Sequence, residues 1–191
     1  MDALRFFQQY VASPGRVGAI LPSSMSLARV MADIGKVREA SVVVEFGPGT
    51  GALTRGIVEE LNPGAAFLAI EINSGFAHAL RKRFPQAHVF QGCATHVRSY
   101  LREMNFEACD CIVSGLPWAL FDEGLQCEVL DAAKEALRPA GVFVTFTYLH
   151  SPLLPGGKRF REKLYDRFSQ VGVSPTVWRN IPPAFAYCAV K

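Results

Sequence analysis

The stretch that most constrains the fold of this chain covers residues 42–53 and reads VVVEFGPGTGAL. Three β-branched residues predict a buried strand, and the chain then breaks at Gly47, Gly49 and Gly51. Helix-forming residues continue from there to Leu61, so we expect a strand, a glycine turn and a helix. Glycine lets the backbone turn tightly and leaves room for a ligand that a Cβ atom would obstruct. The first amides of the helix are then free to bind polar groups of that ligand.

A second apolar run, residues 66–70, ends in Glu71, twenty residues after Gly51. A carboxylate at the tip of the second strand is placed to accept hydrogen bonds from the hydroxyl groups of a ribose. A glycine turn alone predicts only a tight connection. A strand, glycine turn, helix, strand and terminal carboxylate in this order predict a nucleotide-binding α/β unit.

The residues around the first glycine bear on the kind of nucleotide. A dinucleotide fingerprint would leave room for a pyrophosphate over its glycines. Here Glu45 lies two residues before Gly47, and Pro48 stiffens the turn. A carboxylate would repel a pyrophosphate, whereas it suits a ligand that carries an ammonium group. The pattern resembles the first motif of S-adenosylmethionine-dependent methyltransferases of the Rossmann-like class, which implies S-adenosylmethionine as the cofactor and S-adenosylhomocysteine as its product.

Length and composition narrow the class of protein further. The chain has 191 residues, enough for a single domain with a real core, and half of its residues are apolar. No apolar run approaches the ~20 residues that span a bilayer, and the N-terminus lacks the apolar core of a signal peptide, so we expect a cytoplasmic protein. The five cysteines show no metal-ligand spacing, and we expect no metal site and a monomer.

Strands and helices alternate along the chain. Strands are predicted at 42–46, 66–71, 87–91, 109–114, 142–148, near 173–179 and at 184–190; helices are predicted at 26–34, 52–61, 74–84, 124–137 and 155–168. This alternation predicts an α/β fold with a mostly parallel seven-stranded sheet flanked by helices. Together with the resemblance of the glycine turn, it implies a single-domain Rossmann-like class I methyltransferase. We expect an N-terminal helical segment, 1–40, and a cofactor-binding core, 41–191. The ligand should lie at the carboxyl ends of the strands.

The loop after the fourth predicted strand, Ser114-Gly115-Leu116-Pro117-Trp118, bears on the methyl acceptor. Enzymes that methylate adenine N6 resemble one another in having Asn or Asp here, followed by Pro-Pro-Tyr or Pro-Phe. The amide and a backbone carbonyl accept hydrogen bonds from the amine and remove its lone pair from the ring conjugation. Gly115 has no side chain that could accept such a bond. An alkyl amine needs only deprotonation and alignment with the sulfonium methyl, so the loop favours an aliphatic amine.

Several segments together resemble the bacterial phospholipid N-methyltransferases of the soluble, rRNA-methylase-like type. They are SPGRVGAILPSSMSLARVMA, VEFGPGTGALT, FPQAHVFQG, VSGLPW, FVTFTYLHSPLLP and VWRNIPPAFAYCAV. The resemblance covers nearly the whole chain, and SGLP and IPPA are more discriminating than the glycine turn. It implies stepwise methylation of phosphatidylethanolamine towards phosphatidylcholine, with one S-adenosylmethionine for each methyl group. Ribosomal RNA adenine dimethyltransferases, a label often given to similar proteins, carry an extra C-terminal helical domain that we do not expect here.

The resemblance also implies a set of cofactor contacts. We expect Gly47, Gly49 and Gly51 near the amino-acid part of the cofactor, Glu45 at its ammonium group and Glu71 at its ribose. Further contacts are expected from neighbouring residues and from the ends of the next strands: Phe46, Thr50, Ile72, Cys93, Ala94, Ser114, Gly115 and Leu116. Methyltransferases of this class usually place an acid where Cys93 stands, to hold the adenine amino group. Backbone groups are expected to replace it here.

Two amphipathic segments predict contact with a membrane surface. Residues 2–12 gather apolar and aromatic side chains on one arc, and residues 155–168 combine five basic residues with an apolar stripe. Each pattern alone is more typical of an ordinary amphipathic helix that packs on the domain. With a lipid substrate, they predict peripheral attachment to the anionic inner face of the membrane. The same charges would attract RNA, although we expect no nucleic-acid partner.

No residue of the sequence stands out as a general base. Tyr148 and His150, just past the fifth strand, are the candidates, although a packing tyrosine and a surface histidine are commoner. We expect the substrate to contact Tyr10, Pro117, Trp118 and Tyr148, whose aromatic faces would stabilise a methylated ammonium product; for Trp118, simple packing is an equal alternative. Two other functions remain open: a methyltransferase for a nucleic-acid or small-molecule amine, of which an rRNA adenine N6 dimethyltransferase is one form, and a cofactor-binding protein without enzymatic activity.

Overall fold

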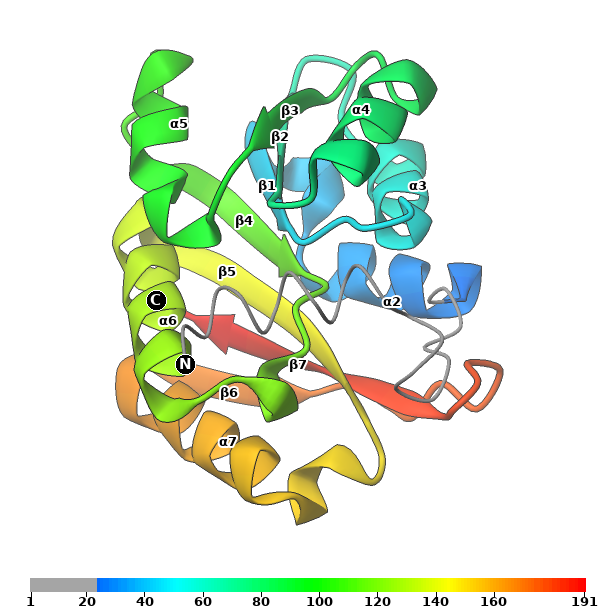
Figure 1. The fold of residues 1–191 in the computed structure, drawn as a ribbon, viewed down its shortest axis with the longest axis vertical. Helices are drawn as coiled ribbons and strands as arrows, with labels where there is room; N and C mark the ends of the chain where they lie inside the picture. The colour runs from blue at the N-terminus through cyan, green and yellow to red at the C-terminus, as the bar shows by residue number, and fades with distance from the viewer. Residues whose placement is uncertain (1–23) are drawn as a thin grey trace.

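Strand β1 (Val42–Phe46) lies near the middle of a seven-stranded sheet whose strand order is β3-β2-β1-β4-β5-β7-β6 (Figure 1). The computed structural model describes residues 24–191. The other strands are β2 (Ala66–Glu71), β3 (His88–Gln91), β4 (Cys109–Ser114), β5 (Leu137–Tyr148), β6 (Gln170–Val173) and β7 (Ala184–Val190). The helices are α2 (Met25–Ile34), α3 (Ala52–Glu60), α4 (Ser74–Arg83), α5 (Val97–Glu103), α6 (Glu123–Ala136) and α7 (Pro155–Arg167). Short 3-10 turns are η1 (Val37–Glu39), η2 (Ala94–His96), η3 (Trp118–Leu120) and η4 (Ser151–Leu153).

The first five strands are parallel, and β7 runs antiparallel between β5 and β6. Five parallel strands need crossover connections, and the intervening helices supply them. Because the carboxyl ends of parallel strands share one edge, the glycine turn after β1, Glu71 after β2 and the loop after β4 lie along the same edge of the sheet. The antiparallel strand β7 begins at this edge, since Ala184 pairs with Tyr148 at the end of β5.

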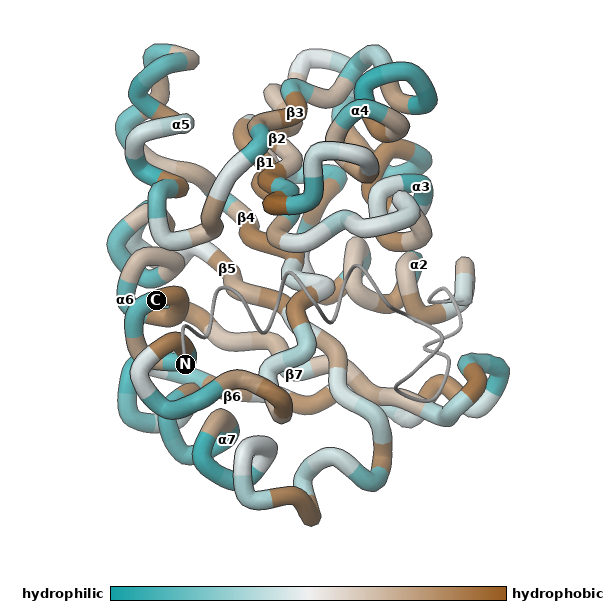
Figure 2. The backbone as a smooth tube through the Cα atoms, in the orientation of Figure 1, coloured by the Kyte–Doolittle hydropathy of each residue, from teal (hydrophilic) through white to brown (hydrophobic). Residues whose placement is uncertain are grey.

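Both faces of the sheet are covered by helices, and alternate residues of each strand supply two separate cores. Val42, Val44 and Phe46 point to the face covered by α5, α6 and α7, while Val43 points to the face covered by α2, α3 and α4. Figure 2 shows the apolar residues concentrated along the central strands and the polar residues on the outer helices. A sheet covered on both faces explains why the strands read as continuous apolar runs in the sequence.

Helix α2 belongs to this packed layer. Ser24 caps it, since its side chain accepts a hydrogen bond from the amide of Leu27. Leu27, Ala28, Met31 and Ala32 are buried in the core on the α3 side of the sheet. The predicted amphipathic segment 2–12, including Tyr10, lies outside the described residues.

The structure confirms the predicted α/β class and corrects three elements. Helix α5 was not predicted, although Val97 and Leu101 stand four residues apart and both are buried. The last but one strand is β6 at 170–173 and not near 173–179. Strand β5 begins directly after α6, five residues earlier than expected, and Ala140 takes a positive φ where the pairing with β4 shifts register. None of the helices within residues 24–191 has the length and apolarity that crossing a membrane would require.

Candidate active site

The glycine turn takes its shape from three residues with positive φ: Gly47 at +65°, Gly49 at +54° and Gly51 at +83°. This region of backbone space favours glycine. A Cβ atom at Gly47 would come within 2.7 Å of Leu116, and one at Gly51 within 2.6 Å of Phe84. A Cβ atom at Gly49 would meet nothing within 4 Å. The outer two glycines therefore allow close packing, while the central one borders open space where a ligand would fit.

Glu71 holds the centre of this turn. Its Oε2 atom accepts a hydrogen bond of 2.9 Å from the amide of Gly49, and its Oε1 atom accepts one of 2.8 Å from the amide of Asn73. The side chain is buried, and burial raises the pKa of the carboxyl group, although the backbone hydrogen bonds lower it. A carboxylate offers about four acceptor positions, so acceptor capacity remains for two further hydroxyl donors.

Glu45 lies fully buried behind the same turn. The hydroxyl group of Thr54 donates a hydrogen bond of 2.7 Å to its Oε2 atom, whereas Oε1 has no hydrogen-bond partner within residues 24–191. Burial raises the pKa of Glu45 to about 8; the Thr54 hydrogen bond opposes this shift and the charge of Glu71 adds to it. A buried acceptor without a partner is costly, so this oxygen indicates a place for a polar ligand group.

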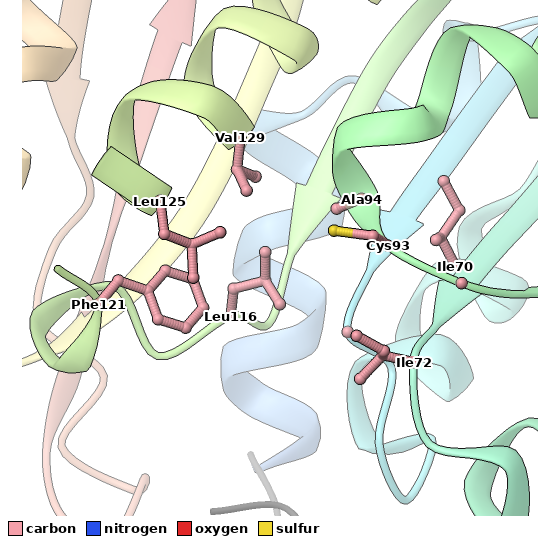
Figure 3. Close-up of a pocket in the computed structure, with 10 residues that line it drawn as sticks. Ile70, Ile72, Cys93, Ala94, Leu116, Phe121, Leu125 and Val129 are labelled. Carbon is pink, nitrogen blue, oxygen red and sulfur yellow. The ribbon is translucent and has the colours of Figure 1, made fainter. Parts of the chain in front are cut away.

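An apolar cavity opens beside the glycine turn, between the ends of β2 and β3 and the start of α6 (Figure 3). Ile70, Ile72, Cys93 and Ala94 line it on the strand side. Leu116, Phe121, Leu125 and Val129 face them from the β4 loop and α6. The remaining lining residues are Gly47 and Gly92. A cavity with these walls suits a flat, weakly polar ring such as a nucleobase.

Five residues predicted to hold the cofactor line this cavity: Gly47, Ile72, Cys93, Ala94 and Leu116. The prediction missed the wall formed by Phe121, Leu125 and Val129, which repeat every four residues into α6. That spacing places apolar side chains on one helix face, and it directly follows the loop already singled out. The signal was therefore present in the sequence.

The loop after β4 is fixed by a buried hydrogen-bond network. The indole Nε1 of Trp118 donates to Ser114 Oγ at 3.2 Å and to Thr145 Oγ1 at 3.0 Å. The Thr145 hydroxyl group in turn donates to the backbone oxygen of Ser114 at 3.1 Å. Phe160 stacks on the indole ring with 4.6 Å between ring centroids. Trp118 is only 3% exposed and packs in the core, which favours the packing role; its contact with the substrate stays a prediction.

Gly115 has a steric role besides its lack of an acceptor. A Cβ atom there would lie 2.8 Å from the backbone oxygen of Gly47. The amide of Gly115 also donates a hydrogen bond of 2.8 Å to the backbone oxygen of Phe46. The loop after β4 is thus pressed against the glycine turn, and any larger residue at this position would separate the two.

The two predicted catalytic residues lie together, away from the cavity. The Tyr148 and His150 rings are parallel, with 5.8 Å between centroids. Tyr148 is half-buried, His150 is exposed, and neither residue lines the cavity of Figure 3. Thr145 pairs with Ser114 at the end of β4, and Tyr148 follows three residues later, about 10 Å further along the strand. Both residues therefore project beyond the β4 end, at the same edge of the sheet.

These features fit the cofactor that the sequence pattern implies. Gly49 leaves open space, and the Glu45 oxygen that lacks a partner among residues 24–191 suits an ammonium group. Glu71 suits ribose hydroxyl groups, and the apolar cavity suits adenine. Cys93 supplies a thiol where an acid is usual in this class, so the cavity wall offers no carboxylate to the adenine amino group.

Comparison with known proteins identifies a relative that aligns along almost the whole chain. No family model matches the chain. The chain is 31% identical over 189 residues to the ornithine lipid N-methyltransferase of Singulisphaera acidiphila, an alignment that covers 97% of this chain and 94% of the relative.

Two solved structures share the fold at low sequence identity. The O-methyltransferase TomG from Streptomyces achromogenes, in complex with S-adenosylmethionine, superposes with a TM-score of 0.69 at 16% identity and covers 100% of this chain and 90% of that one. An O-methyltransferase from Bacillus cereus, in complex with S-adenosylhomocysteine, gives a TM-score of 0.68 at 16% identity over 100% of this chain and 91% of that one. With the sequence identity to the Singulisphaera protein along almost the whole chain, this protein belongs to the bacterial lipid N-methyltransferases of the Rossmann-like S-adenosylmethionine-dependent superfamily.

Proposed function

We propose that the protein transfers the methyl group of S-adenosylmethionine to the primary amine of a membrane lipid. The observation that carries this proposal is the lack of room at Gly115, where a Cβ atom would lie 2.8 Å from the backbone oxygen of Gly47. This position therefore carries no side chain that could accept a hydrogen bond from a conjugated amine. An aliphatic amine needs no such acceptor, because its lone pair is already localised once the amine is deprotonated. Membership of a lipid N-methyltransferase family supports the same acceptor class.

The cofactor would be held by the residues around the glycine turn. Glu45 would accept a hydrogen bond from the ammonium group, and Glu71 would accept hydrogen bonds from the ribose hydroxyl groups. The cavity walls would enclose the adenine ring. When bound, S-adenosylmethionine supplies a sulfonium methyl group as the electrophile. The chain's own contribution is alignment of the amine and exclusion of water by apolar residues such as Leu116 and Phe121.

Ornithine lipid is the first candidate headgroup, since the relative that aligns over 97% of this chain bears that name. Phosphatidylethanolamine, which the sequence resemblance implies, is the second. Both present an unconjugated primary amine at the membrane surface. Tyr148 and His150, at the carboxyl end of β5, remain the proposed acceptors of its proton, and Pro117, half-buried at the start of η3, remains a proposed substrate contact.

Attachment to the membrane is part of the proposal, with residues 2–12 as one contact. The basic face of α7 contributes less than the sequence suggested. Lys163 pairs with Glu123 at 2.8 Å and Arg167 pairs with Asp131 at 2.7 Å, so two of its five charges are compensated. Lys158 and Arg161 remain exposed for anionic lipids.

The test is a methyl-transfer assay with radiolabelled S-adenosylmethionine. The purified protein is offered detergent micelles of ornithine lipid, micelles of phosphatidylethanolamine, or total RNA, and each reaction is extracted into organic solvent. Label in the organic phase with either lipid is the expected result, and the ratio between the two lipids identifies the headgroup. Label recovered in the RNA, with none in lipid, would overturn the proposal.

Two variants make the assay specific. Glu71→Ala removes the proposed ribose contact and should abolish most of the transfer. Tyr165→Ala changes a side chain that is 49% exposed on α7, far along the helix from the site, and should leave the transfer unchanged.

A further inference from the structure

We propose that two loops at the carboxyl edge of the sheet, residues 149–154 and 174–183, form a surface that inserts into an anionic lipid bilayer. We call them the two-loop surface. The inference deepens the proposed function, because it names how the enzyme reaches a lipid substrate. It assigns this contact to residues that the sequence analysis did not connect with a membrane.

The first observation is the exposure of large apolar side chains. Leu153 is 76% exposed, Trp178 is 72% exposed and Ile181 is 68% exposed. Leu149 and Leu154, in the first loop, are exposed as well. The two loops thus hold five of the eight large apolar residues that are exposed within the described part of the chain. Scattered exposed apolar residues are ordinary, but a concentration of them on neighbouring loops marks an interaction surface.

The second observation is the position of the loops. The loop 149–154 follows β5, and the loop 174–183 precedes the antiparallel strand β7, so both lie at one edge of the sheet (Figure 1). The amide of Leu149 donates a hydrogen bond of 3.1 Å to the backbone oxygen of Pro183, which joins them. The glycine turn and the loop after β4 lie along this same edge. A bilayer against the two-loop surface would therefore present lipid headgroups beside the cofactor site.

The third observation is that the second loop is built to hold its apolar side chains outward. Asn180 is only 2% exposed and lies between Trp178 and Ile181 in the sequence. Its Oδ1 atom accepts a hydrogen bond of 2.8 Å from the amide of Ser24, and its Nδ2 atom donates one of 2.7 Å to the backbone oxygen of Pro182. The buried asparagine fixes the loop to the start of α2, so its apolar neighbours are exposed by a defined backbone.

The charges around the loops fit an anionic bilayer. Residues 149–158 and 174–183 contain no Asp or Glu, whereas Lys158 and Arg179 are both exposed. Apolar side chains with nearby cations and no acids are typical of surfaces that enter the headgroup region of anionic membranes. Tryptophan is the side chain that proteins most favour at this depth, together with tyrosine.

The chain offers a built-in probe for the test. It has two tryptophans, of which Trp118 is buried and Trp178 is exposed. Fluorescence of the full chain is recorded with acrylamide as the quencher, first without vesicles and then with vesicles of phosphatidylglycerol and phosphatidylcholine or of phosphatidylcholine alone. We expect the anionic vesicles to shift the emission to shorter wavelength and to protect it from acrylamide. Trp178→Phe should remove this response.

Vesicle binding is then measured by co-sedimentation. The double variant Trp178→Ala/Ile181→Ala should lower the partition coefficient roughly tenfold or more, since two large apolar side chains are lost from the inserted area. The control is His88→Ala, which removes an exposed ring on β3, at the opposite end of the strand order from β6 and outside both the loops and α7; it should bind as the parent does. Equal binding by the double variant and the parent would overturn the proposal. So would protection of Trp178 from acrylamide without vesicles, because another protein surface would then cover it.

Activity on detergent-solubilised lipid separates this proposal from the proposed function. The double variant should methylate micellar lipid at the parental rate and vesicle lipid at a reduced rate. Methyl transfer to micellar lipid without any vesicle binding would refute the two-loop surface and leave the function standing. Vesicle binding with protection of Trp178, but no lipid methylation, would refute the function and leave the surface standing.

Discussion

The hydroxyl group of Thr54 donates a hydrogen bond of 2.7 Å to Glu45 in the interior of the protein, behind the glycine turn. The other oxygen of this carboxyl group has no hydrogen-bond partner among the described residues. Because burial raises the pKa of Glu45 to about 8, the group is protonated at neutral pH. A protonated carboxyl group attracts an ammonium group far less than a carboxylate does, so the protonation state of Glu45 should control cofactor binding.

The affinity for S-adenosylmethionine is therefore expected to increase between pH 6.5 and 7.5, where the α-amino group of the cofactor is still mostly protonated. If the ammonium group binds only the ionised form, the dissociation constant falls by up to about tenfold per pH unit below the pKa of Glu45, and binding releases a proton. Isothermal titration at several pH values, in buffers of different ionisation enthalpy, measures both effects. Glu45→Gln should bind more weakly at pH 7.5 and show a much flatter profile. A pH-independent affinity of the parent protein would refute this role of Glu45.

Glu45 should also impose a pH dependence on folding. Its pKa is about 8 in the folded protein, above the ordinary value of 4.5, so between these values the folded state holds a proton that the unfolded chain releases. The contribution of Glu45 to the free energy of unfolding therefore falls as pH rises from about 4.5 to 8. The melting temperature of Glu45→Gln, relative to that of the parent protein, should therefore increase as pH rises through this window. A constant difference between the two proteins would contradict the expectation.

Glu71→Ala should weaken cofactor binding by roughly tenfold to a hundredfold, the range expected for lost hydrogen bonds to a charged group. The variant removes the ribose acceptor and also leaves the amide of Gly49 without its present partner. Glu71→Gln keeps one oxygen acceptor and should lose less. Calorimetric titration at pH 8 gives both values, and an unchanged affinity of the alanine variant would exclude the ribose position assigned to this residue.

Gly115→Ala tests the contact between the loop after β4 and the glycine turn. The added methyl group would lie 2.8 Å from the backbone oxygen of Gly47, so one of the two segments must move. We expect a loss of about 1–3 kcal/mol in the free energy of unfolding, as for other overpacked sites, together with weaker cofactor binding. Gly64→Ala is the control, because a Cβ atom there meets nothing within 4 Å. Urea unfolding should give a lower free energy of unfolding for Gly115→Ala than for Gly64→Ala.

The sequence predicted those features whose cause is local. Strand β1, its glycine turn and the position of Glu71 at the end of β2 were predicted correctly, because apolar runs and glycine positions determine them within a few residues. Helix α5 was missed because it has only seven residues and because the side chain of its N-cap residue, His96, makes no capping hydrogen bond. The cavity wall on α6 was missed because its apolar residues, Phe121, Leu125 and Val129, extend from the loop after β4 into the helix and so belong to two predicted elements.

The orientation of Trp118 required the folded structure. Its indole donor reaches Thr145, 27 residues further along the chain, and its ring stacks on Phe160 of α7. No local pattern contains these partners, so packing and substrate contact were equal alternatives from the sequence. Exposure of Trp178 depends equally on distant residues, since the buried Asn180 connects its loop to Ser24.

A substitution at Trp118 distinguishes the two roles by experiment. Trp118→Phe retains an aromatic ring but removes the indole N–H, so the hydroxyl oxygens of Ser114 and Thr145 lose the hydrogen bond that they accept from it. We expect the free energy of unfolding to fall by about 1–3 kcal/mol, measured by urea denaturation. Because the donor is shared with Thr145, the double variant Trp118→Phe/Thr145→Val should be less destabilised than the sum of the single variants. A side chain that contacts the headgroup would give the opposite result, an increased KM for lipid at unchanged stability.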